Sequence, residues 1–168
     1  IGFISTRFSG TDGVTLETSK WAQVFERNGH RCFWFAGELD RDPDVSYEAV
    51  EAHFQHEINE RINAAVFGTS QRASGASDLI QHQSQILKRH LYRFLQKFDI
   101  DLLVAENILS LPMQIPLGLA LTAVLAETRT PAIAHHHDFH WERDRYLVNA
   151  AGDYLQAAFP PRLPNIAH

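Results

Sequence analysis

The stretch "IGFISTRFSGTDGVTLETSKWAQVFERNGHRCFWFAG", residues 1–37, contains a complete strand–loop–helix–strand unit. Residues 1–5 form a short apolar strand, and the turn-forming glycines and aspartate of residues 10–13 follow it as a loop. Residues 15–30 predict a helix, and the apolar residues 31–37 predict a second buried strand. The apolar positions at helical spacing are Leu16, Trp21, Val24 and Phe25. Two strands joined in this way normally lie parallel, with a right-handed crossover.

The rest of the chain continues this alternation. Residues 99–107 and 130–137 are short apolar runs that predict strands. Residues 78–98 predict a long amphipathic helix, residues 111–129 a nearly apolar buried helix and residues 141–159 a polar helical cover. Strands that alternate with helices specify an α/β fold, here a three-layer sandwich with a mostly parallel sheet.

Two details of the helices are less regular. A polar turn around Pro43 leads into a helical segment with Val50, Phe54, Ile58 and Ile62 on one face. The long helix is expected to begin with Asp78 as its N-cap, because aspartate readily accepts hydrogen bonds from the first helical N–H groups.

The composition limits the possible functions. The 168 residues include 45% hydrophobic and 21% charged residues, which is typical of one globular domain. The net charge of −5 argues against general binding to nucleic acid or acidic membranes, and no apolar stretch approaches the ~20 residues of a membrane span. A single cysteine, Cys32, fits a reducing compartment, so we expect a cytoplasmic location.

Both ends of the sequence look cut. The chain opens inside an expected strand without a methionine and stops on His168 after a proline-rich segment. We therefore expect residues 1–168 to be a single domain excised from a longer protein.

Polar groups follow three of the expected strands. Gly10–Gly13 come after the first strand, Glu106 and Asn107 end another, and the residues from His135 to Asp138 end the last. Ligands of parallel α/β sheets bind beyond the carboxyl ends of the strands. The sequence therefore predicts that these groups meet at one edge of the sheet and form a site.

The histidine cluster in "AHHHDFH", residues 134–140, allows three interpretations. His136, His140 and Asp138 could form a metal site, although no recognised zinc spacing supports it. His135 and His136 suit structural, hydrogen-bonded roles, since successive side chains of a strand point to opposite faces. His137 lies where the strand should end, so its imidazole could meet a substrate.

The remaining features indicate structural roles or stay open. The glycine loop lacks both the dinucleotide and the P-loop pattern, although the following helix N-terminus could present N–H groups to a phosphate. The alternating charges of residues 142–145 predict a solvated or locally paired face. Cys32 has no activating neighbour in the sequence, and Trp141 could either cap the core or wall a pocket.

Taken together, "GTDGVTLETSKWAQVFERNGH", "FAG", "AEN" and "HHHDFHWERDRY" resemble the N-terminal domain of retaining glycosyltransferases with the GT-B fold, family 4 (group 1). Residues 21–30 match the family's first helix. Residues 131–139 match a strand that supplies a histidine, here His137. The resemblance covers nearly the whole chain, and its specificity comes from the order and spacing of several motifs.

The resemblance implies a Rossmann-like domain that binds the acceptor, while an absent C-terminal domain holds most of a nucleoside diphosphate sugar. It implies that His137 contacts the donor sugar and serves catalysis. Gly10, Thr11, Asp12 and Gly13 would lie near the diphosphate and acceptor, and Glu106, Asn107 and Asp138 would border the acceptor pocket.

The implied reaction transfers a sugar from a nucleoside diphosphate to an acceptor sugar or other hydroxyl compound with retention, generally without a required metal or other cofactor. The isolated domain would be inactive. Two alternatives remain open at this point: a ligand-binding or sensing module, and a metal-dependent hydrolase that uses the histidines.

Overall fold

The computed structural model describes residues 1–168 and contains one six-stranded sheet in which all neighbouring strands are parallel. The strand order is β3-β2-β1-β4-β5-β6, the order of a Rossmann fold. The strands are β1 (Gly2–Ile4), β2 (Phe33–Ala36), β3 (Ser46–Glu48), β4 (Leu103–Glu106), β5 (Ala132–His135) and β6 (Ile166–Ala167). The α/β fold class is confirmed.

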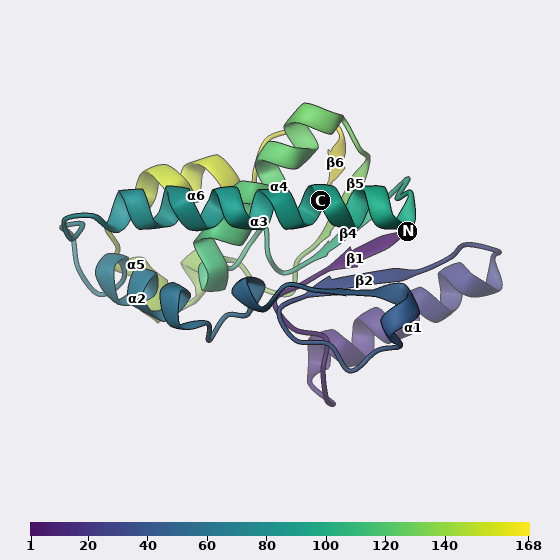
Figure 1. Cartoon of the computed structure of the whole chain (residues 1–168). Helices are drawn as coiled ribbons and strands as arrows, with labels where there is room; N and C mark the ends of the chain where they lie inside the picture. The colour runs from purple at the N-terminus through teal and green to yellow at the C-terminus, as the bar shows by residue number, and fades with distance from the viewer.

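Helices cover both faces of this sheet (Figure 1). The α-helices are α1 (Gly13–Arg27), α2 (Glu57–Val66), α3 (Ala76–Phe98), α4 (Ile115–Thr128), α5 (Asp144–Leu147) and α6 (Gly152–Ala158). Short 3₁₀ turns are η1 (Pro43–Val45), η2 (Val50–Ala52), η3 (Pro112–Gln114) and η4 (His140–Glu142). None of the helices combines the length and apolar character that crossing a bilayer requires.

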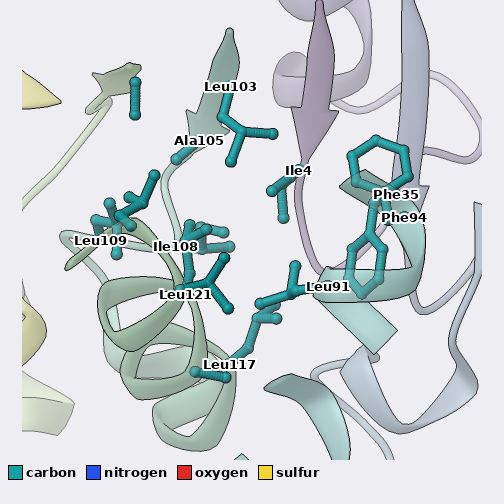
Figure 2. Close-up of a cluster of buried hydrophobic side chains, with 14 of the residues drawn as sticks. Ile4, Phe35, Leu91, Phe94, Leu103, Ala105, Ile108, Leu109, Leu117 and Leu121 are labelled. Atoms are coloured by element: carbon teal, nitrogen blue, oxygen red, sulfur yellow. The ribbon is translucent and has the colours of Figure 1, made fainter. Parts of the chain in front are cut away.

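The main hydrophobic core lies between the sheet and the helices α3 and α4. Figure 2 shows Ile4, Leu103 and Ala105 from the strands facing Leu91 of α3 and Leu121 of α4. Alternate residues of the same strands, including Phe3, Trp34 and Val104, pack in a smaller cluster with Ala22 and Phe25 of α1. The period-2 alternation of each buried strand thus separates two cores.

The strand order reverses between β1 and β4. From β1 the chain moves outward through β2 and β3, and it then returns to β4 and moves outward on the other side. At such a switch point the connections leave in opposite directions, so a crevice opens beyond the carboxyl ends of the two strands.

Several sequence expectations require correction. The helix expected around residues 50–66 begins only at Glu57, and Val50 stands in a 3₁₀ turn with 55% exposure instead of on the buried face. The long helix begins at Ala76 after Gly75, which has a φ of 78°, so Asp78 lies in the first turn and is not the cap. The polar C-terminal cover consists of η4, α5 and α6, not of one helix.

The sequence did not predict the strands β3 and β6. They have three and two residues, and each forms an edge of the sheet. Strands this short carry no readable alternation of apolar and polar residues, so only their pairing with β2 and β5 defines them.

Candidate functional site

Glu106 and His135 end two neighbouring strands and are direct partners in the register of β4 and β5. Both side chains lie on the α1 face, because Leu103 and Ala105 occupy the α3/α4 face and the orientation alternates along the strand. His137, two residues beyond His135, returns to the same face, and its ring centroid lies 4.6 Å from that of His135. We call Glu106, His135 and His137 the His–Glu cluster.

The carboxylate of Glu106 is the centre of this cluster. Its side chain is 0% exposed, and its Oε2 lies 3.0 Å from Nδ1 of His135 and 3.5 Å from Nε2 of His137. The other oxygen, Oε1, is buried without a hydrogen-bond partner. Burial raises the pKa of Glu106 to about 7, although the His137 imidazole acts in the opposite direction.

Asn107 fixes the backbone next to the cluster. Its φ of 64° places it in the left-handed region, where asparagine is among the most tolerated residues. In this conformation its N–H donates to the His135 carbonyl (2.9 Å), and its Oδ1 accepts from the backbone N–H of His137 (3.0 Å). Two consecutive residues of one strand end thus position both the main chain and the ring of His137.

Helix α1 forms one wall of the site. The Trp21 ring stacks on His135 at a centroid distance of 4.5 Å and an interplanar angle of 19°. The helical spacing of the apolar residues predicts Trp21 on the buried face of this helix. The structure shows it partly buried, in contact with both the α1 core and the His–Glu cluster.

The glycine loop lies beyond the carboxyl end of β1, to which residues 5–9 connect it. Gly10 has a φ of 76° and donates its N–H to Asp40 (2.7 Å). Asp12 caps α1 by accepting from the Thr15 N–H (3.1 Å), and it forms an ion pair with Arg7. Partial burial alone would raise the pKa of Asp12, but the hydrogen bonds from Thr15 and the Arg7 guanidinium outweigh it and lower the pKa.

The loop is open to an approaching ligand at several positions. Gly10, Thr11 and Gly13 are exposed, and a Cβ added at either glycine would meet no atom within 4 Å. α1 also has no acidic residue in its first turn, so apart from the Asp12 cap its N-terminal dipole is not opposed there.

Asn107 and Asp138 share a second hollow. Together with Leu111, Met113, Arg143, Asp144 and Arg145 they line a cavity of about 530 Å³. Asp138 forms an ion pair with Arg143, and residues 142–145 are all exposed, which confirms the solvated face predicted for the alternating charges. Asn107 and Asp138 thus line the same cavity, while their role at an acceptor pocket stays a prediction.

The metal group considered from the sequence is not assembled. His136 points away from the cluster, with its Nε2 2.9 Å from Nδ1 of His168, and Asp138 is engaged with Arg143. The structure instead brings together Glu106, His135 and His137, whose ligand atoms all lie within 4.8 Å of one another. The sequence could predict part of this cluster, because two histidines that are two residues apart at a strand end point to the same face. It could not predict the register that places Glu106 opposite His135.

The structure also places Cys32, Trp141 and the aromatic residues of β2. Cys32 is buried, and burial raises its pKa to about 11, as expected for an unreactive thiol. Trp141 is exposed, stacks on Phe139 and lines a cavity of about 1230 Å³, so it walls a pocket. Phe33, Trp34 and Phe35 are core residues, as predicted.

Fold and site together define an α/β protein of Rossmann-like topology with a polar cluster beside its switch point. The chain is 33% identical over 177 aligned residues to mannosylglucosylglycerate synthase of Thermotoga maritima, an alignment that covers 100% of this chain and 39% of that protein. It is 27% identical over 174 residues to mannosylglucosylglycerate synthase of Petrotoga mobilis, covering 96% of this chain and 38% of the relative. No family model and no solved structure matches the chain.

The chain therefore spans about two fifths of the length of these curated relatives. The alignments extend over all or nearly all of this chain. The chain is thus similar to part of two proteins that are named as glycosyltransferases.

Proposed function

We propose that residues 1–168 form the N-terminal, acceptor-side domain of a retaining GT-B glycosyltransferase of family 4. The similarity to two mannosylglucosylglycerate synthases across nearly the entire chain carries this proposal. The Rossmann-like topology agrees with it, because a GT-B enzyme pairs two such domains across a cleft. The second domain, which would hold most of the nucleoside diphosphate sugar, corresponds to the part of the relatives that this chain does not cover.

In this proposal His137 contacts the donor sugar. Its Nε2 faces Glu106, so its Nδ1 is the ring nitrogen left for a substrate. A sugar that loses its diphosphate passes through an oxocarbenium-like state, and a fixed imidazole beside the ring can position it and stabilise the developing charge. Glu106 is fully buried, which supports a role in orienting His137 more than a direct contact with the acceptor.

The glycine loop would face the diphosphate and the acceptor. The exposed backbone of Gly10–Gly13 precedes the N-terminus of a 15-residue helix, an arrangement that suits an anion. Closing of the second domain over this edge would exclude water, which otherwise competes with the acceptor for the sugar.

The cavity around Asn107 and Asp138 is our candidate acceptor site. The names of the relatives point to a mannosyl donor and a glucosylglycerate acceptor. Asp138 can accept hydrogen bonds from sugar hydroxyls, and the nearby Arg143 and Arg145 suit the carboxylate of a glycerate group. The chemistry of the lining therefore agrees with a charged sugar acceptor.

The decisive experiment uses the longer protein that carries this chain together with the proposed second domain. It is incubated with a nucleoside diphosphate α-mannose and glucosylglycerate, and the product is analysed by NMR. We expect an α-linked mannosyl product, and we expect His137→Ala to lower kcat by about 10²-fold or more. His136→Gln is the matched control, because the neighbouring ring points away from the cluster.

Three results would contradict the proposal. An inverted product would exclude the retaining assignment. Turnover by the isolated chain of residues 1–168 would contradict the division of the site between two domains. Binding of the sugar without any transfer by the longer protein would favour a sensing module.

A further inference from the structure

We propose that Glu106, His135 and His137 form a binding site for one divalent transition-metal ion of the zinc type. The proposal goes beyond the sugar-transfer function and does not depend on it, since the resemblance implies no required metal. It rests on the arrangement of the three side chains within this domain.

The spacing of the ligand atoms fits such an ion. Nδ1 of His135 and Nε2 of His137 lie 3.0 and 3.5 Å from the same oxygen of Glu106. Ligands bound about 2.0–2.2 Å from a tetrahedral zinc ion are about 3.4 Å apart from one another. Two of the three edges of such a coordination face thus have about the required length, and the third, between the two imidazole nitrogens, is at most 4.8 Å, so modest side-chain adjustments would admit the ion.

A second observation points to a ligand at this place. Oε1 of Glu106 is buried and has no hydrogen-bond partner, in a side chain that is 0% exposed. A buried carboxylate oxygen without a partner is costly, because it has lost its hydration without replacement. A cation bound by this carboxylate would compensate for the lost hydration with its positive charge.

The surroundings hold the ligands in place. Glu106 and His135 are paired residues of two central strands, and Asn107 holds the backbone of His137 through a 3.0 Å hydrogen bond. Trp21 stacks on the His135 ring. Metal sites depend on such supporting contacts, which orient the ligands before the ion arrives.

The cluster is also accessible from one side. The side chains of His135 and His137 are 23% and 30% exposed, whereas Glu106 lies beneath them. Three protein ligands leave a fourth position of a tetrahedral ion free. That position would open toward the carboxyl edge of the sheet, where an oxygen of a diphosphate or hydroxyl group could occupy it.

Two imidazoles and one carboxylate favour zinc, cobalt and nickel ions over magnesium and calcium, which prefer oxygen ligands. The competing explanation of the same contacts is a hydrogen-bonded cluster in which both imidazoles donate to Glu106. The two explanations differ in whether the metal-free protein takes up an ion.

The test uses the chain of residues 1–168, freed of metal with a chelator. Zn²⁺ is titrated by calorimetry, and Co²⁺ is followed by its visible absorption, which reports nitrogen and oxygen coordination. We expect one equivalent of either ion to bind in the presence of excess Mg²⁺. Glu106→Gln, His135→Gln and His137→Gln should each weaken binding by about 100-fold or more, above the 10–100-fold effect of losing a supporting contact.

Two control variants carry the same histidine-to-glutamine substitution at positions outside the His–Glu cluster. His136→Gln alters the adjacent residue on the opposite side, and His90→Gln alters a distant histidine that lies 3.7 Å from Glu51. Both should bind Zn²⁺ as the unmodified chain does. Circular dichroism confirms that each variant is folded.

Absence of stoichiometric binding by the folded chain would overturn the proposal. Binding that survives in the three cluster variants, or that is lost in His136→Gln, would overturn it as well, because the ion would then sit elsewhere. Since no sugar nucleotide is present, failure of this test leaves the transferase proposal intact, and failure of the transferase assay leaves the metal proposal intact.

Discussion

The two faces of the sheet are built from the same strands but do different things. On the α3/α4 face, Leu103 and Ala105 of β4 pack into a large apolar cluster with the two helices. On the α1 face, the alternate positions of β4 are Val104 and Glu106. Val104 joins a small apolar cluster, whereas the carboxylate of Glu106 contacts the imidazoles of His135 and His137. One face is filled with apolar contacts throughout, whereas the other becomes polar at the carboxyl ends of the strands.

This difference shows how a small domain can hold a buried ionisable group. The extensive core on one face stabilises the domain. This offsets the destabilising effect of a carboxylate oxygen that is buried without a partner on the other face. The comparison predicts that substitutions on the core face destabilise the protein and that neutralising the site face stabilises it.

The largest effect is expected on the core face. Leu121→Ala removes a fully buried side chain that faces the strands in Figure 2. The free energy of unfolding should fall by about 2–5 kcal/mol, because the lost burial and the cavity both contribute. Urea denaturation measures it, and a loss below about 1 kcal/mol would mean that this face is not the main source of stability.

Glu106→Gln should have the opposite sign. The pKa of Glu106 is raised from its ordinary value of 4.5 to about 7, so the folded state binds more protons than the unfolded state between these values. Stability of the unmodified protein therefore falls as the pH rises through this range, and the variant avoids that loss. We expect the variant to be about 3 kcal/mol more stable at pH 8, with little difference near pH 4.5.

The measurement for Glu106→Gln is thermal or urea unfolding over this pH range, with a chelator present so that no metal contributes. A pH-independent difference would show that the carboxylate charge is not the cause.

The helices that cover the two faces provide a smaller contrast. Asp12 caps α1 through Thr15, whereas Asp78 lies inside α3 and caps nothing. Asp12→Ala should lower the free energy of unfolding by about 1 kcal/mol, and Asp78→Ala should change it by less than about 0.5 kcal/mol. Equal effects in urea denaturation would argue against the cap at Asp12.

The smallest expected effect concerns Cys32 in the small cluster under α1. Burial raises its pKa to about 11, so almost no thiolate forms at pH 8. A thiol reagent should label the folded protein far more slowly than the urea-unfolded protein, as absorbance of the released chromophore reports. Rapid labelling of the folded chain would show that the α1 face opens readily.

Much of the fold could be read from the sequence, because the decisive signals were local. The helix of residues 15–30 and the apolar strands around Phe35, Val104 and Ile133 each show their periodicity within a few residues. The short edge strands β3 and β6 lack such a signal, and the cap at Gly75 depends on a positive φ that no neighbouring residue announces.

The candidate site could be predicted only in outline. The rule for parallel sheets correctly gathered the strand ends at Glu106 and His135. It did not reveal that Glu106 contacts His135 and His137 beneath the surface, nor that His136 turns toward His168. These contacts depend on how two strands distant in sequence pair with each other.

The sequence by itself determined the alternation of strands and helices, the glycine loop and the polar strand ends, because each follows from residue types and spacing along a short segment. The tertiary structure alone decided which polar groups touch. A register shift of one residue between β4 and β5 would separate Glu106 from His135, and side-chain direction in a strand reverses at every residue. The cluster therefore follows from long-range pairing that is set by burial of the whole core.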